Sequence, residues 1–324
     1  MGVSHAASLA HVPRAELVAI CDLVPDLLEQ FKRDWGDRWP DTNVYTDYKE
    51  MLANERLDIL TVATSDHRHA DITVDGANAG VKGIFCEKPL ATTLEDADRM
   101  IRACEAKGVI VSVDYTRRWS PILHTVRETV RSGAIGCLRT VIVEHGGPRA
   151  MLFRNGTHLI DAVCFFVESE PVHVFARLED GFEHWDRYRG DGGKLPENDP
   201  SASGLIIFDD GVRAFYCGSK STVRESNSLQ LLDDQGEVQL LGNAPTADLT
   251  TWDAVKSGDV VRRTIIPVQY RVQGIVAAYE ELIDLIENGG TATSSAREAR
   301  KTLQIMLGFL KSQQAGGLLV DVPE

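Results

Sequence analysis

The feature that most constrains this fold is a strict alternation of strand and helix patterns between residues 16 and 113. Short apolar runs at 16–21, 57–63, 83–86 and 109–113 are separated by helix patterns. Apolar runs of this length are typical of strands that are buried on both faces of a parallel sheet. Such strands in turn with helices predict an α/β fold with a doubly wound parallel sheet.

After residue 119 the pattern changes. Strand-like runs follow one another with few helices between them, at 138–144, 172–178, 203–208, 212–217, 229–232 and 238–241. Asp209-Asp210-Gly211 predicts a hairpin turn. We therefore expect a second, α+β domain with a large open, mainly antiparallel sheet, in which 185–200 is an exposed loop and helices at 272–288 and 296–311 close the fold. A chain of 324 residues is long enough for two such domains, predicted at 1–119 and 120–324.

Charge and composition narrow the range of partners. The 48 acidic and 34 basic residues give a net charge of −14, which argues against nucleic acid and anionic membranes as partners. No apolar run approaches the roughly 20 residues of a membrane span, and no signal segment is recognisable, so we expect a cytoplasmic protein. The six cysteines are scattered and never form C-x-x-C, which predicts reduced thiols and no zinc site.

One charged pair stands at the end of a buried strand. Glu87 and Lys88 follow the apolar residues 83–86 directly, and Pro89 comes next. Proline favours an extended conformation at the residue before it, which would direct Lys88 beyond the carboxyl edge of the sheet. Open α/β sheets bind ligands at that edge. A solvated ion pair that caps the strand explains the same residues equally well.

A glycine and an acid near the start have the spacing of a dinucleotide-binding unit. In a Rossmann-type βαβ unit, G-x-G-x-x-G joins strand to helix, and an acid about 20 residues later binds the ribose. Gly2 and Asp22 have that separation, with Gly2 as the third glycine. The first strand and the first two glycines would then be missing from the N-terminus of this domain.

Several motifs in order resemble one known family. They are Asp22 after a strand, the run 64–70, Glu87-Lys88-Pro89, the run 132–136 and Gly156-Thr157-His158 with Asp161. Together they are similar to the Gfo/Idh/MocA family of glucose-fructose oxidoreductase and inositol 2-dehydrogenase. The resemblance implies an NAD(P)-dependent dehydrogenase or reductase that acts on CH–OH groups of a sugar, polyol or sugar acid. It also implies a homodimer or homotetramer, formed through the open face of the second-domain sheet.

The resemblance bears on the first residues too. Met1-Gly2 is similar to the end of a G-x-G-x-M-G turn, so we expect a start site placed too late, with a strand and turn of roughly 10 residues upstream. The alternative is a true truncation, which would weaken folding and cofactor binding.

Three catalytic residues follow from the resemblance. Lys88 would hydrogen-bond the reacting oxygen, and His158 would take or return the hydroxyl proton. His158 could instead be a helix-start histidine satisfied by backbone groups. Asp161, one helical turn on, would orient His158 or contact substrate, or it is an ordinary first-turn acid favoured by the helix dipole.

The predicted cofactor is NAD rather than NADP. The carboxylate of Asp22 can bind a free ribose 2′-hydroxyl and would repel a 2′-phosphate. His67 and His69 alternate with other polar residues, but no further ligands complete a metal site. The predicted cofactor-binding residues are Gly2, Asp22, Thr64, Ser65, Asp66, His69, Glu87, Lys88 and Arg117.

One position departs from the family pattern. Polyol-oxidising members have an aspartate four residues before the histidine, where this chain has Arg154. A guanidinium binds carboxylate or phosphate in a bidentate manner, so Arg154 predicts an acidic group on the substrate, or it is a surface arginine. The predicted substrate-binding residues are Lys88, Arg154 and His158. Two other functions remain open, an NAD-dependent glycosidase and a non-catalytic relative that has lost cofactor binding.

Overall fold

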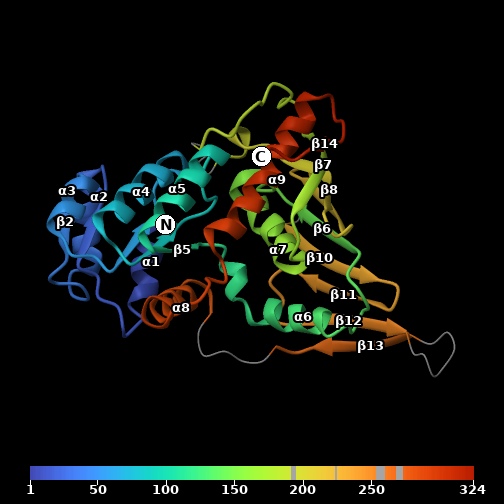
Figure 1. Ribbon diagram of the computed structural model, residues 1–324, viewed down its shortest axis with the longest axis horizontal. Coiled ribbons are helices and arrows are strands. Elements are labelled where there is room, and N and C mark those ends of the chain that lie inside the picture. The colour runs from blue at the N-terminus through green and yellow to red at the C-terminus, as the bar shows by residue number, and fades with distance from the viewer. Residues whose placement is uncertain (191–194, 223–224, 253–259, 268–272) are drawn as a thin grey trace. The chain divides into compact units, whose positions relative to one another are not determined.

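The computed structural model describes residues 1–190, 195–222, 225–252, 260–267 and 273–324. The chain divides into two compact units (Figure 1). The first consists of Met1–Ala91, Glu95–Thr116 and Val272–Arg297, and the second of Thr92–Leu94, Arg117–Arg271 and Glu298–Glu324. A late helix, α8 (Gly274–Asn288), thus belongs to the first unit. The single boundary expected between residues 119 and 120 stays a prediction.

The strands of the first unit are all parallel. β1 (Ala19–Cys21) pairs with β2 (Asn43–Tyr45), and β4 (Gly83–Cys86) lies between β3 (Ile59–Val62) and β5 (Ile110–Val113). Among the described residues no strand pairs with both groups, so they form a two-stranded and a three-stranded sheet. The helices of this part of the chain are α1 (Gly2–Leu9), α2 (Pro25–Trp35), α3 (Tyr48–Asn54), the 3-10 turn η1 (Asp66–Arg68), α4 (His69–Ala79), α5 (Leu94–Lys107) and α8.

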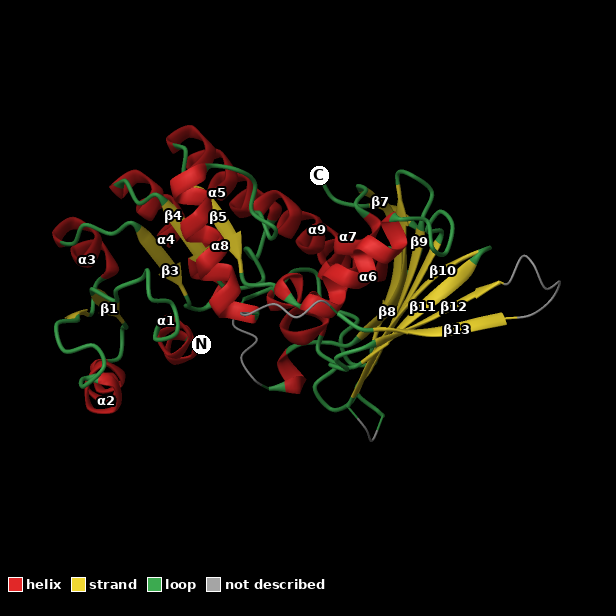
Figure 2. Cartoon of the chain, turned by 90° about the horizontal axis from the view of Figure 1, so that it is seen from below, coloured by secondary structure: helices red, strands yellow, loops and turns green. Residues whose placement is uncertain are grey.

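The central strand β4 is buried on both faces. On one face Ile84 lies 3.7 Å from the position that a Cβ on Gly76 of α4 would take. On the other face Phe85 packs edge-on against Tyr279 of α8, with ring centroids 4.8 Å apart. Alternate residues of a strand point to opposite faces, so β4 is enclosed between α4 and α8 (Figure 2). Glu87 and Lys88, which follow the end of this strand, therefore have a fixed backbone position.

The second unit is built on one nine-stranded sheet of order β13-β12-β11-β10-β6-β9-β8-β7-β14. All described pairs are antiparallel except β6 with β9. Helices α6, α7 and α9 lie on one face of it (Figure 2). The strands are β6 (Thr140–Gly146), β7 (Pro171–Leu178), β8 (Ala202–Phe208), β9 (Arg213–Ser219), β10 (Ser226–Asp233), β11 (Gly236–Leu241), β12 (Ala247–Trp252), β13 (Val260–Ile265) and β14 (Val320–Asp321), and the helical segments are η2 (Thr116–Trp119), α6 (Pro121–Arg131), η3 (Leu152–Gly156), α7 (Thr157–Val167), η4 (Pro196–Asn198) and α9 (Ala296–Gln314).

These findings confirm the predicted fold class and the hairpin between β8 and β9, where Phe208 N–H donates to Val212. The prediction of an exposed loop at 185–200 is wrong for its aromatic residues. Trp185 and Tyr188 are buried, and Tyr188 stacks on Phe153 at 4.0 Å. Residues 191–194 of this loop, and residue 272 at the expected helix start, lie outside the described residues. All six cysteines are free. In the described chain no helix has the length and apolarity to cross a membrane.

Candidate active site

Lys88 lies at the carboxyl end of β4 and is 9% exposed. The preceding Glu87 is 4% exposed, and its Oε1 lies 3.1 Å from Nε2 of His5 in α1. Asp114, directly after β5, brings its Oδ2 to 3.8 Å from the same nitrogen. The other ring nitrogen of His5 lies 3.0 Å from the hydroxyl of Tyr279. Two acids, a histidine and a tyrosine thus surround the start of the Lys88 segment.

The electrostatics of this group differ between its two acids. Burial, with the nearby charge of Glu87, raises the pKa of Asp114 to about 8, although Lys88 opposes this rise. Burial alone would also raise the pKa of Glu87, but the hydrogen bond and charge of His5, together with the charge of Lys88, lower it below its ordinary value. Near neutral pH, therefore, the shifts favour an ionised Glu87 and a protonated Asp114.

The predicted cofactor residues of the first unit follow the carboxyl ends of its strands. Asp22 follows β1, and its Oδ1 accepts a hydrogen bond of 2.9 Å from Val24 N–H, which holds the carboxylate at the start of α2. Thr64 and Ser65 are exposed after β3, and Asp66 begins η1. The carboxyl ends of parallel strands are where open α/β sheets bind nucleotides, so these donors and acceptors fit NAD.

Two other predicted cofactor residues have different surroundings. Gly2 is exposed in the first turn of α1, and a Cβ there would meet nothing within 4 Å. His69 is fully buried, and its Nδ1 lies 3.0 Å from the carbonyl oxygen of Pro89. His69 therefore links α4 to the segment that follows Lys88, a contact that its sequence neighbours do not indicate. His67 is exposed, so the two histidines do not share one environment.

His158 lies in the first turn of α7 and belongs to the second unit. Of the 11 residues of α7, His158 alone is not buried. The helix begins after the π-helical turn η3, where a Cβ on Gly156 would come within 2.2 Å of the Tyr216 hydroxyl. Only glycine allows this close approach, and it fixes where α7 starts. His158 is thereby the one side chain that this apolar helix leaves accessible.

Arg154 lies within η3, whose backbone is held by an acid that the sequence did not reveal. Asp199 accepts hydrogen bonds from the N–H groups of Phe153 and Arg154, at 3.1 and 2.8 Å. Asp199 is separated from Arg154 by 45 positions and follows η4. Since no local motif marks such a contact, sequence reasoning missed it. The carboxylate fixes the turn that carries Arg154.

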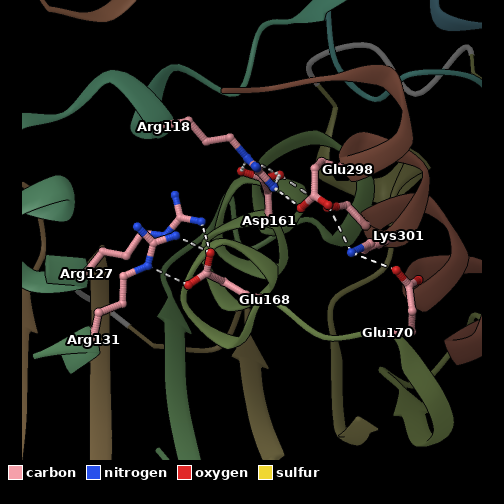
Figure 3. A network of polar contacts seen from close by, with 9 residues as sticks. Arg118, Arg127, Arg131, Asp161, Glu168, Glu170, Glu298 and Lys301 are labelled. Atoms are coloured by element: carbon pink, nitrogen blue, oxygen red, sulfur yellow. Dashed lines mark hydrogen bonds and ion pairs between the residues drawn. The ribbon is translucent and has the colours of Figure 1, made fainter. Parts of the chain in front are cut away.

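Asp161 is paired rather than open to solvent (Figure 3). Its oxygens accept bonds of 3.0 and 2.9 Å from Nε of Arg118, and Arg118 is buried as well. Thr302 lies at 3.4 Å from Oδ1, and Glu298 approaches Arg118 to 3.5 Å. Burial lowers the pKa of Arg118, but the charge and hydrogen bonds of Asp161 outweigh this and raise it above its ordinary value. The arrangement favours a positioning role for Asp161.

Arg117, next to Arg118 in the chain, is half-buried, and this burial lowers its pKa. Burial, with the charge of Arg117, lowers the pKa of His145 to about 4. Nδ1 of His145 lies 2.8 Å from the hydroxyl of Tyr216. Neither His145 nor Tyr216 was predicted as a site residue, because each lies in an ordinary strand pattern.

The chain is similar to several characterised oxidoreductases. A sequence model described as "Oxidoreductase family, NAD-binding Rossmann fold" matches residues 1–115. Myo-inositol 2-dehydrogenase of Thermotoga maritima is 32% identical over 264 residues, which cover 73% of this chain and 77% of that protein. D-apiose dehydrogenase of Paraburkholderia graminis is 37% identical over 133 residues, which cover 41% of this chain and 34% of that protein.

The fold is shared with solved structures as well. A levoglucosan dehydrogenase in complex with NADH and L-sorbose superimposes with a TM-score of 0.83 at 20% identity, covering 100% of this chain and 96% of that one. These comparisons confirm the predicted fold class and family. The chain belongs to the Gfo/Idh/MocA family of oxidoreductases.

Proposed function

We propose that this protein is an NAD-dependent oxidoreductase that moves hydride between the nicotinamide and a CH–OH carbon of a sugar, polyol or sugar acid. Membership of the family and its NAD-binding description support this proposal. The observation that carries it is the placement of Lys88, a buried lysine at the carboxyl end of the central strand with ionised Glu87 beside it. A buried ammonium is costly unless it has a partner and a task.

The proposed roles divide between the two units. Lys88 donates a hydrogen bond to the oxygen at the reacting carbon and stabilises negative charge that develops there. His158, the accessible residue of α7, takes the hydroxyl proton during oxidation and returns it during reduction. Asp161 is a positioning residue that holds the Arg118 guanidinium by its hydrogen bond of 3.0 Å. When bound, NAD accepts or supplies the hydride.

The cofactor residues bind and orient. Asp22 would accept hydrogen bonds from the adenosine ribose, which favours NAD over NADP. Gly2 would admit the pyrophosphate, and Thr64, Ser65 and Asp66 would contact the dinucleotide after β3. His69, through Pro89, holds the segment behind Lys88 in place. Contacts of Glu87 and Arg117 with the nicotinamide ribose complete the proposed set.

We further propose that Arg154 selects substrates with an acidic group. Asp199 fixes the backbone of this residue, so its side chain starts from a defined point. Arg154→Asp should lower kcat/KM for a uronate more than for the matching neutral sugar. Arg149, an exposed arginine of the preceding turn, gives the control Arg149→Asp. Equal losses for both substrates would contradict the selection.

A second copy of this chain is the proposed partner. On the face of the large sheet that carries no helix, Phe175, Leu205, Phe215 and Ile142 are cross-strand neighbours in successive strands. Phe175 and Phe215 are 37% and 40% exposed. A continuous apolar row of this kind favours a self-complementary interface. Light scattering should give a dimer or tetramer, and Phe215→Glu should give smaller species.

The experiment that tests the function combines cofactor binding with turnover. Titration calorimetry should show tighter binding of NAD than of NADP, and NADH absorbance should rise with a sugar, polyol or sugar acid. Lys88→Met should abolish turnover and leave NAD binding within about tenfold. Lys82→Met, at an exposed lysine paired with Asp58, is the matched control. Product without net NADH would favour a glycosidase, and no NAD binding would overturn the proposal.

A further inference from the structure

His5, Glu87, Asp114 and Tyr279 form a buried cluster, here called the His5 cluster, that the proposed function does not use as a unit. We propose that this cluster holds one dissociable proton beyond that of Lys88, and that His5, acting through Glu87, is a positioning residue that keeps the Lys88 ammonium available to substrate. The proposal rests on the function proposed for Lys88. All five residues belong to the first unit.

The geometry allows His5 to gain or lose a proton without movement of heavy atoms. The Tyr279 hydroxyl lies 3.0 Å from Nδ1 of His5 and 2.8 Å from Oγ1 of Thr61. When His5 is neutral, Tyr279 donates to Nδ1 and Nε2–H donates to Glu87. When His5 is protonated, Nδ1–H donates to Tyr279, which then donates to Thr61. Both states of the ring therefore keep all of these hydrogen bonds.

The walls of the cluster keep its charges in a medium of low polarity. The ring of Phe85 meets the ring of His5 edge-on at 5.3 Å and that of Tyr279 at 4.8 Å. The thiol of Cys86 stays neutral, because burial, aided by the charge of Glu87, raises its pKa well above the ordinary value. Charged groups in such surroundings interact strongly, so a net charge on the cluster is unfavourable.

A count of the charges gives the extra proton. The titratable groups that face one another are His5 from α1, Glu87 and Lys88 after β4, Asp114 after β5 and Tyr279 from α8. Lys88 neutralises one carboxylate. A second buried carboxylate needs either a proton of its own or a protonated His5. One proton is thus shared between Asp114 and His5, and the site stays neutral in either arrangement.

Loss of this proton acts on Lys88. A second negative charge beside the ammonium would bind it more strongly to the two acids and make it a weaker donor to substrate. We therefore expect kcat to fall on the alkaline side as the cluster loses its proton. In His5→Gln the side-chain amide can still donate to Glu87 but cannot carry charge. The cluster then loses one of the two sites that share the proton and binds it less tightly, so the alkaline limb moves to lower pH.

The test is the pH dependence of kcat for the intact protein with NAD and an accepted substrate. His5→Gln should lower the pH of the alkaline limb by up to about one unit. Asp114→Asn should remove the limb, and Tyr279→Phe, which keeps the ring, should shift it without loss of folding. His11→Gln, at an exposed histidine after α1, should match wild type. NAD affinity and KM should stay within about twofold, which separates this effect from simple loss of structure.

Several results would overturn the inference. One is an active wild-type enzyme whose alkaline limb is unchanged in both His5→Gln and Tyr279→Phe. Another is a stoichiometric divalent metal in the purified protein that is absent from His5→Gln, because the same three ligand atoms lie within 4.8 Å of one another. If wild type shows no NAD-linked turnover, the proposed function fails, and the proton is followed by NMR of the His5 ring. A His5 titration that Asp114→Asn leaves unchanged would then overturn the inference separately.

Discussion

The buried ion pair of Arg118 and Asp161 allows a direct test of how much a buried charge contributes to the stability of the second unit. We expect Asp161→Asn to lower the free energy of unfolding by about 3–5 kcal/mol, the usual cost of removing one partner from a buried ion pair. The substitution keeps the size of the side chain and removes only its charge. The loss therefore measures what it costs to leave the Arg118 guanidinium buried without a full counter-charge.

The surrounding contacts set where in that range each variant should fall. In Asp161→Asn, Arg118 keeps Glu298 at 3.5 Å, a partner that is 33% exposed, so the loss should lie near 3 kcal/mol, about the lower limit. In Arg118→Met, the fully buried Asp161 keeps, among the residues that the structure describes, the weak contact of 3.4 Å with Thr302. Its loss should be larger. The double variant Arg118→Met with Asp161→Leu removes both charges of this pair and should recover much of the stability.

Urea unfolding followed by circular dichroism gives these free energies. The matched control is Glu128→Gln, which removes an exposed ion pair with Arg131 in the same unit. That control should change stability by less than about 1 kcal/mol. An Asp161→Asn variant within about 0.5 kcal/mol of wild type would refute the reasoning, since the pair would then carry no net charge interaction.

Three further results are expected. The folded protein holds a proton on Asp114 up to about pH 8, whereas the unfolded chain releases it near pH 4. The free energy of unfolding should therefore decline as the pH rises from about 4 to about 8, by up to about 1.4 kcal/mol per pH unit. Asp114→Asn should flatten this decline in thermal melts. Gly156→Ala should cost about 1–3 kcal/mol, because its Cβ would press on the buried Tyr216 hydroxyl; no change in melting would contradict this. Asp22→Ala should reduce the preference for NAD over NADP at least tenfold, roughly the loss of one ribose hydrogen bond, and an unchanged ratio of dissociation constants would exclude Asp22 from the ribose site.

The sequence predicted most of the helices and strands that have a strong local pattern of apolar residues. The buried run at β4 has no polar alternation, and its boundaries were predicted as observed. Strands β12 and β13 were not predicted. β13 is exposed along most of its length and reads VVRRTI, so its stability comes from pairing with β12 rather than from a buried apolar face. Such edge strands leave a weak signal in a single sequence.

In the candidate site too, residues with a local sequence signal were predicted and residues that act through long-range contacts were not. Lys88 was found because its signal is local, a charge that follows a buried strand and precedes a proline. Asp199 was missed because its partners lie far away in sequence. Its neighbours predicted only a polar loop. Long-range hydrogen bonds of this kind fix the turn before His158, and nothing within a short window of sequence marks them.

Glu87 and Lys88 are adjacent in the sequence but have different roles in the fold. In the sequence it is one half of a charged pair, and its expected contact with the cofactor stays a prediction. In the fold its Oε1 faces His5, a residue 82 positions away, while its Oε2 accepts a bond of 3.3 Å from the backbone N–H of Lys88. Both oxygens are thus engaged within the protein. The ionised Glu87 supplies the negative charge that stabilises the buried ammonium of Lys88. Of these two residues, therefore, only Lys88 is proposed to contact the substrate.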